Sequence, residues 1–107
     1  MLPDEYSFVV VFEQTDKNTV RIYFPDLPDC TAVCIDYTDK KVKAIMKAYE
    51  ILVLHLYKME NKGDVIPKPS DISDIRLNNN ETANLITAKM KSFRKKMNQM
   101  MQKGAMS

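Results

Sequence analysis

The sequence predicts one α+β domain, in which a small antiparallel sheet (order along the chain β-β-β-α-β) carries one long helix packed on one face. Two runs of β-branched and aromatic residues near the N-terminus are separated by a polar turn, which is typical of a hairpin. Residues 42–59 repeat apolar side chains at spacings of three and four, as an amphipathic helix does. The chain has 107 residues, 45% of them hydrophobic, which fits a single globular domain.

The first three strands are expected at residues 6–14, 19–24 and 31–35. In the first run, Phe8, Val10 and Phe12 alternate on one face, and valines on the opposite face indicate that the centre of this strand is covered on both sides. The polar residues 15–18 (TDKN) form the turn of a hairpin. Residues 25–29 (PDLPD) should end the second strand, because proline cannot donate a ladder hydrogen bond.

A helix of about six turns is expected from about residue 38 to residue 62. Thr38 is the expected N-cap, and Gly63 is expected to end the helix in a left-handed conformation. Small Ala44 and Ala48, with Met46 and Val53, widen the apolar stripe. The stripe itself is expected to consist of Val42, Ile45, Tyr49, Leu52, Leu56 and Met59.

The last third of the chain allows two interpretations. Residues 64–73 contain Pro67 and Pro69 and indicate a semi-rigid connector. Residues 82–88 (TANLITA) fit a short strand, yet apolar residues from Ile86 to Met100 also keep helical spacing. Periodicity alone cannot separate the two. A strand would cover an otherwise exposed sheet edge, which favours the strand.

Charge divides the chain into an acidic body and a basic tail, although the formal net charge is only +2. Residues 1–81 hold 10 basic and 14 acidic residues, and residues 82–107 hold 6 basic residues and no acid. An acidic body suits a basic protein partner, and a basic tail suits nucleic acid or simply solubility. We therefore predict a partner-binding domain over residues 1–88 and a basic, methionine-rich, helical tail over residues 89–107.

Catalytic, metal and cofactor sites are not expected. Cys30 and Cys34 would lie roughly 13 Å apart on one strand, beyond disulfide reach, and with one histidine elsewhere they cannot complete a zinc site. The carboxylates at 26, 29, 36 and 39 would have to converge to hold magnesium, and their positions in a turn and at a helix start explain them more simply. His55 has no carboxylate or nucleophile partner along its helix.

Three features of the sequence predict a cytoplasmic protein. No apolar run approaches the ~20 residues of a membrane-spanning helix. The start of the sequence, MLPDEYSF, has no basic segment ahead of an apolar stretch, so it does not resemble a secretory signal. Two cysteines do not make a disulfide framework, which also fits a reducing compartment.

The stretch TVRIYFPDLPDCTAVCIDYTDKKVKAIMKAYEIL resembles the N-terminal domain of HicB-type antitoxins. The resemblance rests on two strands joined by a polar turn, the run FPDLPDC (residues 24–30), a third strand, a long helix, and a proline–serine connector at Pro69 and Ser70. A late strand ending near the basic run 93–96 (FRKK) completes the succession. The resemblance covers roughly residues 6–97. On this basis we predict the strand at 82–88, followed by a helix to about residue 102.

The resemblance implies a partial ribonuclease-H-like fold without enzymatic activity. It implies a protein of a type II toxin–antitoxin pair that binds and masks a small basic mRNA-cleaving toxin. Family members also carry a DNA-binding segment at the C-terminus. The 107 residues leave no room for one, so either the chain is truncated or this member lacks the segment, and DNA binding by this chain alone is not expected. The alternative function is a stand-alone oligomeric adaptor or RNA-associated domain.

The predicted toxin-binding residues surround the second turn and the start of the helix. Carboxylates there would meet a basic toxin electrostatically, which mainly orients the partners and speeds their association. Leu27, between Pro25 and Pro28, is expected to stand out as an apolar anchor. The full set comprises Phe24, Asp26, Leu27, Asp29, Asp36 and Asp39.

The tail is the predicted contact between copies of the chain. Apolar residues recur on one face of a terminal segment with no later element to cover them. Packing on the chain's own domain and contact with nucleic acid are the alternatives to a dimer. The predicted contact residues are Phe93, Met97, Met100 and Met101.

Overall fold

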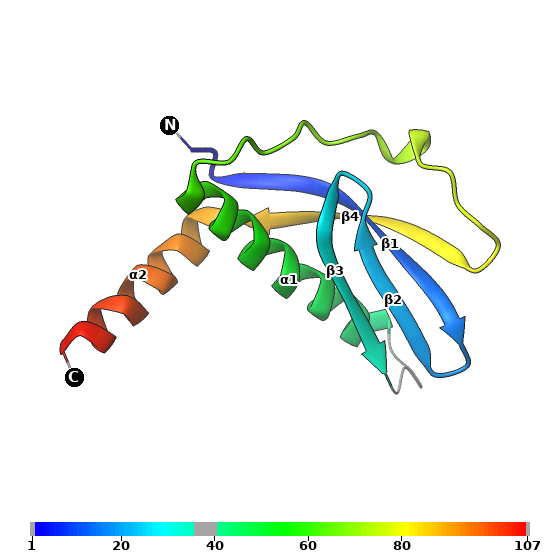
Figure 1. Cartoon of the computed structure of the whole chain (residues 1–107), viewed down its shortest axis with the longest axis horizontal. Coiled ribbons are helices and arrows are strands. Elements are labelled where there is room, and N and C mark those ends of the chain that lie inside the picture. Colours follow the sequence, from blue (N-terminus) through cyan, green and yellow to red (C-terminus); the bar gives the residue numbers. More distant parts are fainter. Residues whose placement is uncertain (1, 36–40, 107) are drawn as a thin grey trace.

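The computed structural model of the chain describes residues 2–35 and 41–106 and shows an α+β fold, as predicted (Figure 1). The strands form one antiparallel sheet in the order β3-β2-β1-β4, and α1 packs across one face of it. The elements are β1 (Glu5–Asp16), β2 (Thr19–Phe24), β3 (Leu27–Ile35), α1 (Lys41–Lys62), the short 3-10 helix η1 (Ile72–Asp74), β4 (Glu81–Lys89) and α2 (Met90–Met106).

Strand β1 is central and buried on both faces. Phe8 and Val10 point into the core beneath α1 and are fully buried. Val9 and Val11 on the opposite face also have 0% exposure, which confirms the prediction of a strand covered on both sides. The hairpin turn is shorter than predicted, because β1 continues to Asp16, whose carboxylate accepts a hydrogen bond of 2.9 Å from the Asn18 backbone.

Strand β3 begins earlier than predicted. The prolines were expected to interrupt the sheet through residue 29, but Phe24 and Leu27 already pair across a tight turn. The next regular pair is Tyr23 with Thr31, so Pro28 lies in an irregular stretch of an edge strand. Proline is tolerated there because no regular ladder hydrogen bond needs its missing N–H.

Helix α1 packs on the sheet through most of the predicted stripe and through the small residues predicted to widen it. Ala44, Ala48, Leu52 and Leu56 are buried at 0–1% exposure. Four members of the predicted stripe face the core: Leu52 and Leu56 fully, Tyr49 and Met59 partly. Val42 is 67% exposed and Ile45 is 43% exposed. Small side chains four residues apart let the helix backbone approach the sheet closely. Because these small side chains face the sheet, the larger side chains of the first turns, on other sides of the helix, point outward.

The C-terminal end of α1 is capped as predicted. Gly63 adopts a φ of 74°, in the left-handed region that glycine occupies without steric cost. The Asp64 N–H donates to the Met59 carbonyl at 2.9 Å and the Gly63 N–H donates to the Glu60 carbonyl at 3.2 Å. This is the Schellman arrangement of a helix end. The predicted N-cap, Thr38, lies outside the described residues.

Strand β4 confirms the choice of a strand over a helix at residues 82–88. It pairs with β1 along its whole length, from Glu5 opposite Lys89 to Glu13 opposite Glu81. Helix α2 follows directly, with Met90 fully buried at its start. Beyond its first turns, α2 extends away from the body of the molecule (Figure 1).

Candidate partner-binding surface

Two of the predicted toxin contacts belong to the core. Phe24 is 1% exposed and Leu27 is 2% exposed, and both pack in the cluster beneath α1. The expectation that flanking prolines hold Leu27 outward is therefore wrong. The turn of Pro25 and Asp26 instead directs Leu27 inward as the first residue of β3. In this fold the two side chains stabilise the domain and are not available as surface anchors.

Asp26 is held by the chain's own connector. Its two carboxylate oxygens accept hydrogen bonds from the Ser70 backbone N–H at 2.8 Å and from the Ser70 hydroxyl at 2.6 Å. The connector thereby lies against the second face of the sheet, beside Ser7 of β1 and Leu85 of β4. Asp26 acts first as a structural residue that attaches this connector to the β2–β3 turn.

Asp29 is the predicted carboxylate that the structure places on the surface. It is exposed at the start of β3, on the rim of a small depression of about 170 Å³ between β3 and α1, which Leu54, His55 and Lys58 also line. The other two predicted carboxylates, Asp36 and Asp39, lie outside the described residues.

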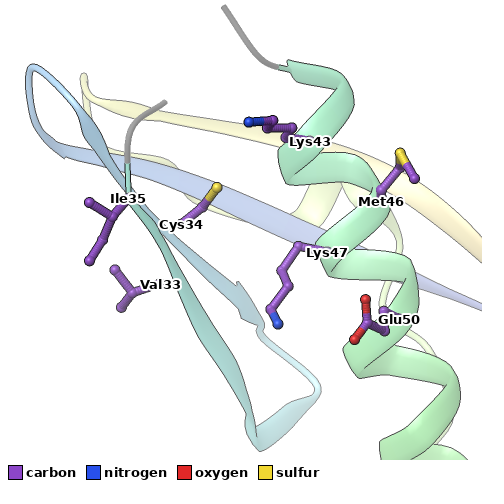
Figure 2. Close-up of a pocket in the computed structure, with 7 residues that line it drawn as sticks. All are labelled: Val33, Cys34, Ile35, Lys43, Met46, Lys47 and Glu50. Carbon is purple, nitrogen blue, oxygen red and sulfur yellow. The ribbon is translucent and has the colours of Figure 1, made fainter. Parts of the chain in front are cut away.

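A second and larger depression, of about 370 Å³, continues the same groove toward the start of α1. Figure 2 shows Lys43 and Lys47 reaching from α1 toward β3, with the Cys34 sulfur pointing back toward the helix. Val33 and Ile35 point away from the helix and are 56% and 70% exposed. We call the two depressions together the β3–α1 groove.

The chemistry of the β3–α1 groove is that of a binding surface. Desolvation raises the pKa of the Cys30 thiol to about 12, so it is not a thiolate nucleophile at neutral pH, and its sulfur lies 3.6 Å from the Ile51 carbonyl. Desolvation lowers the pKa of His55, although the charge of nearby Asp29 opposes this shift. Among residues 2–35 and 41–106, no three potential metal ligands are grouped.

The predicted oligomer contacts differ in their exposure. The Phe93 ring packs edge-on against Tyr57 at a centroid distance of 5.6 Å, so it belongs to the chain's own core. Met97 is half-buried, Met100 is 57% exposed, and the side chain of Met101 lies outside the described part. Helix α2 is fixed by Arg94, whose guanidinium binds the Glu60 carboxylate at 2.6 and 2.9 Å.

Sequence reasoning missed the exposed apolar residues beside the β3–α1 groove. Val42 and Ile45 match the helical period that predicts a core-facing stripe, and Val33 and Ile35 belong to the apolar run 31–35 that predicts the third strand. The available signal was the pair Ala44 and Ala48, whose small size favours close packing on the sheet and so excludes the flanking larger residues from that face.

Comparison with known proteins identifies the fold. No protein-family model matches the sequence, and no curated protein is significantly similar to it. A solved structure described as a toxin–antitoxin complex from Streptococcus pneumoniae contains a chain that superposes with a TM-score of 0.68. The fold is that of a chain in a toxin–antitoxin complex. The similarity covers 83% of this chain and 72% of that chain at 14% sequence identity.

The toxin–antitoxin-related fold agrees with the architecture expected from the sequence. Within the described part of the chain, no helix is long and apolar enough to cross a membrane.

Proposed function

We propose that this protein is a HicB-type antitoxin that binds and masks a small basic mRNA-cleaving toxin and has no enzymatic activity of its own. The observation that carries the proposal is the shared fold over 83% of the chain with a chain of a toxin–antitoxin complex. The run FPDLPDC at residues 24–30 and the Pro69–Ser70 connector support the HicB assignment independently.

The binding would depend on charge. A toxin that cleaves mRNA needs cationic side chains to hold the phosphate backbone. The body of this chain, residues 1–81, carries a net charge of −4 from 10 basic and 14 acidic residues, so it attracts such a surface. Carboxylates that pair with the toxin's phosphate-binding cations would exclude RNA from them, which is a means of masking without catalysis.

Asp29 is the residue that we propose to meet the toxin. It is exposed beside the groove, whereas Asp26 is engaged by Ser70 and the side chains of Phe24 and Leu27 are buried. Asp36 and Asp39 follow β3 in the sequence and are the further carboxylates that we propose to take part. The apolar part of the toxin contact is left to residues other than Phe24 and Leu27.

The decisive experiment is co-purification of the protein with the untagged products of the neighbouring genes. We expect a small basic protein to be retained, and its mRNA cleavage to stop on addition of this chain. Asp29→Lys should weaken the complex and slow association at low salt, because a rim charge is reversed. Asp74→Lys in η1 is the matched control, an exposed carboxylate on the connector. Failure to retain any basic partner contradicts the proposal.

The alternative, an RNA-associated domain, is favoured by one feature of α2. Lys91, Lys95 and Lys96 are exposed on a helix that extends away from the body (Figure 1). If α2 binds RNA, affinity should fall steeply with salt and be reduced in a Lys95→Glu/Lys96→Glu variant. RNA binding of this kind without a retained toxin would favour the alternative.

A further inference from the structure

Large apolar side chains that the fold does not use lie exposed on both elements that border the β3–α1 groove. Those of β3 point away from the helix (Figure 2), and the others belong to the first turns of α1. Exposed apolar surface beside a groove is often an interaction site. The residues and their exposed fractions are Val33 56%, Ile35 70%, Val42 67%, Ile45 43% and Met46 66%.

These side chains lie beside a free sheet edge. Strand β3 is the last strand in the order β3-β2-β1-β4, and among residues 2–35 and 41–106 it pairs only with β2. Its residues 31–35 (TAVCI) contain neither a charge nor a proline, the two devices that usually prevent an edge from pairing. The opposite edge, β4, lies beside the connector and contacts η1.

We propose that the free edge of β3 binds a second copy of this chain. The two β3 strands would pair antiparallel about a two-fold axis near Val33 and join two four-stranded sheets into one continuous sheet. Each Val33 then meets Val33 of the partner subunit on the face away from α1. The first halves of the two α1 helices become neighbours on the other face.

The charge pattern of α1 fits this symmetry. Lys43, Met46, Lys47 and Glu50 all line the groove, so one stripe of the helix faces the β3 side. An antiparallel arrangement centred between Met46 and Lys47 places Lys43 opposite Glu50 of the partner subunit, and Glu50 opposite the partner's Lys43. These two pairs offset the repulsion between the two copies of Lys47, which lie beside the axis. A two-fold interface must be self-complementary in this way.

The proposed pairing centres, Val33 on β3 and Met46 on α1, lie at similar positions along the direction of β3. The Cys30 sulfur contacts the carbonyl of Ile51, which aligns these two residues. Val33 lies about 10 Å further along β3, at roughly 3.3 Å per residue. On α1, which runs in the opposite direction, about 10 Å corresponds to six or seven residues at roughly 1.5 Å each. Counted back from Ile51, this distance reaches Ala44 and Ile45, so an axis through Val33 passes within about one helical turn of Met46.

The charged residues that line the groove disfavour a basic toxin there. They are Lys43, Lys47 and Lys58 against Asp29 and Glu50, so cations outnumber carboxylates. A second copy has the same excess, and the proposed symmetry offsets it by placing each Lys43 opposite Glu50 of the partner subunit. The proposed interface does not use Phe93, a predicted oligomer contact that already packs against Tyr57 of its own chain.

Sedimentation equilibrium on the full chain tests the proposal, and we expect a reversible dimer. Val33→Glu should raise the dimer Kd by about tenfold or more, because like charges then meet at the axis. The monomer tolerates this change, since Val33 is exposed and its cross-strand neighbour is Arg21. Leu85→Glu is the matched control: Leu85 is 58% exposed on the other edge strand and should leave dimerisation unchanged.

A charge swap tests the two-fold geometry separately. Lys43→Glu and Glu50→Lys should each weaken the dimer, because each places like charges opposite one another. The double variant should restore the affinity, since complementarity returns with the signs exchanged. Circular dichroism checks that every variant is folded.

Three results would overturn the proposal: a full chain that stays monomeric at all concentrations, a dimer that is insensitive to Val33→Glu, or a dimer that Leu85→Glu disrupts equally. If Val33→Glu leaves the dimer intact and only releases a bound toxin, which is a case of the second result, the edge belongs to the toxin. The proposal does not depend on the antitoxin function, because self-association is measured on the chain alone.

Discussion

Asp26 and Ser70 are joined by two hydrogen bonds although 44 residues separate them in the sequence. The carboxylate belongs to the β2–β3 turn, and the serine belongs to the connector between α1 and β4. The bond joins the two motifs on which the family resemblance rests, the FPDLPDC run and the proline–serine connector. Their shared purpose in this chain is to place the connector against the second face of the sheet.

Breaking this contact should lower the stability of the fold. We expect Asp26→Asn or Ser70→Ala to reduce the free energy of unfolding by about 1.5–3 kcal/mol, the range for hydrogen bonds to a charged group. The double variant should cost little more than either single one, because both remove the same interaction. Urea unfolding followed by circular dichroism measures all four proteins. Additive effects would show that the two residues act independently.

Leu27 should behave as a core residue. Leu27→Ala is expected to lower the free energy of unfolding by about 2–5 kcal/mol through the cavity it leaves, because the side chain is 2% exposed. Leu85→Ala removes the same atoms from a side chain that is 58% exposed and should have a small effect. Thermal unfolding of both variants separates this prediction from a role as a surface anchor, for which Leu27→Ala would leave the melting temperature unchanged.

The ion pair of Glu60 and Arg94 should stabilise the attachment of α2. The Glu60 side chain is 2% exposed and also accepts a hydrogen bond of 2.9 Å from the Tyr6 hydroxyl. Glu60→Gln leaves the Arg94 guanidinium without its carboxylate, and we expect a loss of about 2 kcal/mol or more, measured by urea unfolding. Glu5→Gln breaks an exposed pair with Lys89 and is the control, with little change expected in the melting temperature.

The same pair predicts a dependence on pH. The hydrogen bonds from Arg94 hold the pKa of Glu60 below its ordinary value of 4.5 in the folded protein. The contribution of ionised Glu60 to the free energy of unfolding is therefore complete above the unfolded-state pKa and is lost as the pH falls through the folded-state pKa. The difference in unfolding free energy between the native protein and Glu60→Gln should stay constant near neutral pH and shrink below about pH 4.5. A difference that grew on acidification would contradict this assignment.

Cleavage of nucleic acid is not expected. Purified protein should leave RNA and DNA intact in the presence of magnesium or manganese, because metal-dependent hydrolysis needs converging carboxylates and Asp26 is already bound to Ser70. Gel assays over a range of metal concentrations measure this. Metal-dependent cleavage that disappears in Asp29→Ala or Asp36→Ala, with the fold intact, would revive a nuclease function.

Local pattern was sufficient for the strands, the hairpin and the end of α1. Alternation in β1 and β2 and the glycine at position 63 each report a conformation that neighbouring residues impose on one another. The pattern was insufficient at β4, where apolar residues at 86 and 90 fit a strand and a helix equally well. Pairing with β1, a strand more than seventy residues away, decides that case.

By itself, the sequence determined the fold class, the order of the elements and the division into an acidic body and a basic tail, because composition and short-range periodicity carry this information. Only the tertiary structure decided which residues are buried. It turned Leu27 inward, engaged Asp26 with Ser70, and rotated α1 so that Ala44 and Ala48 face the sheet while Val42 and Ile45 face solvent. The reason is physical: burial depends on how closely separate elements pack, and that distance is not a property of any one element's own pattern.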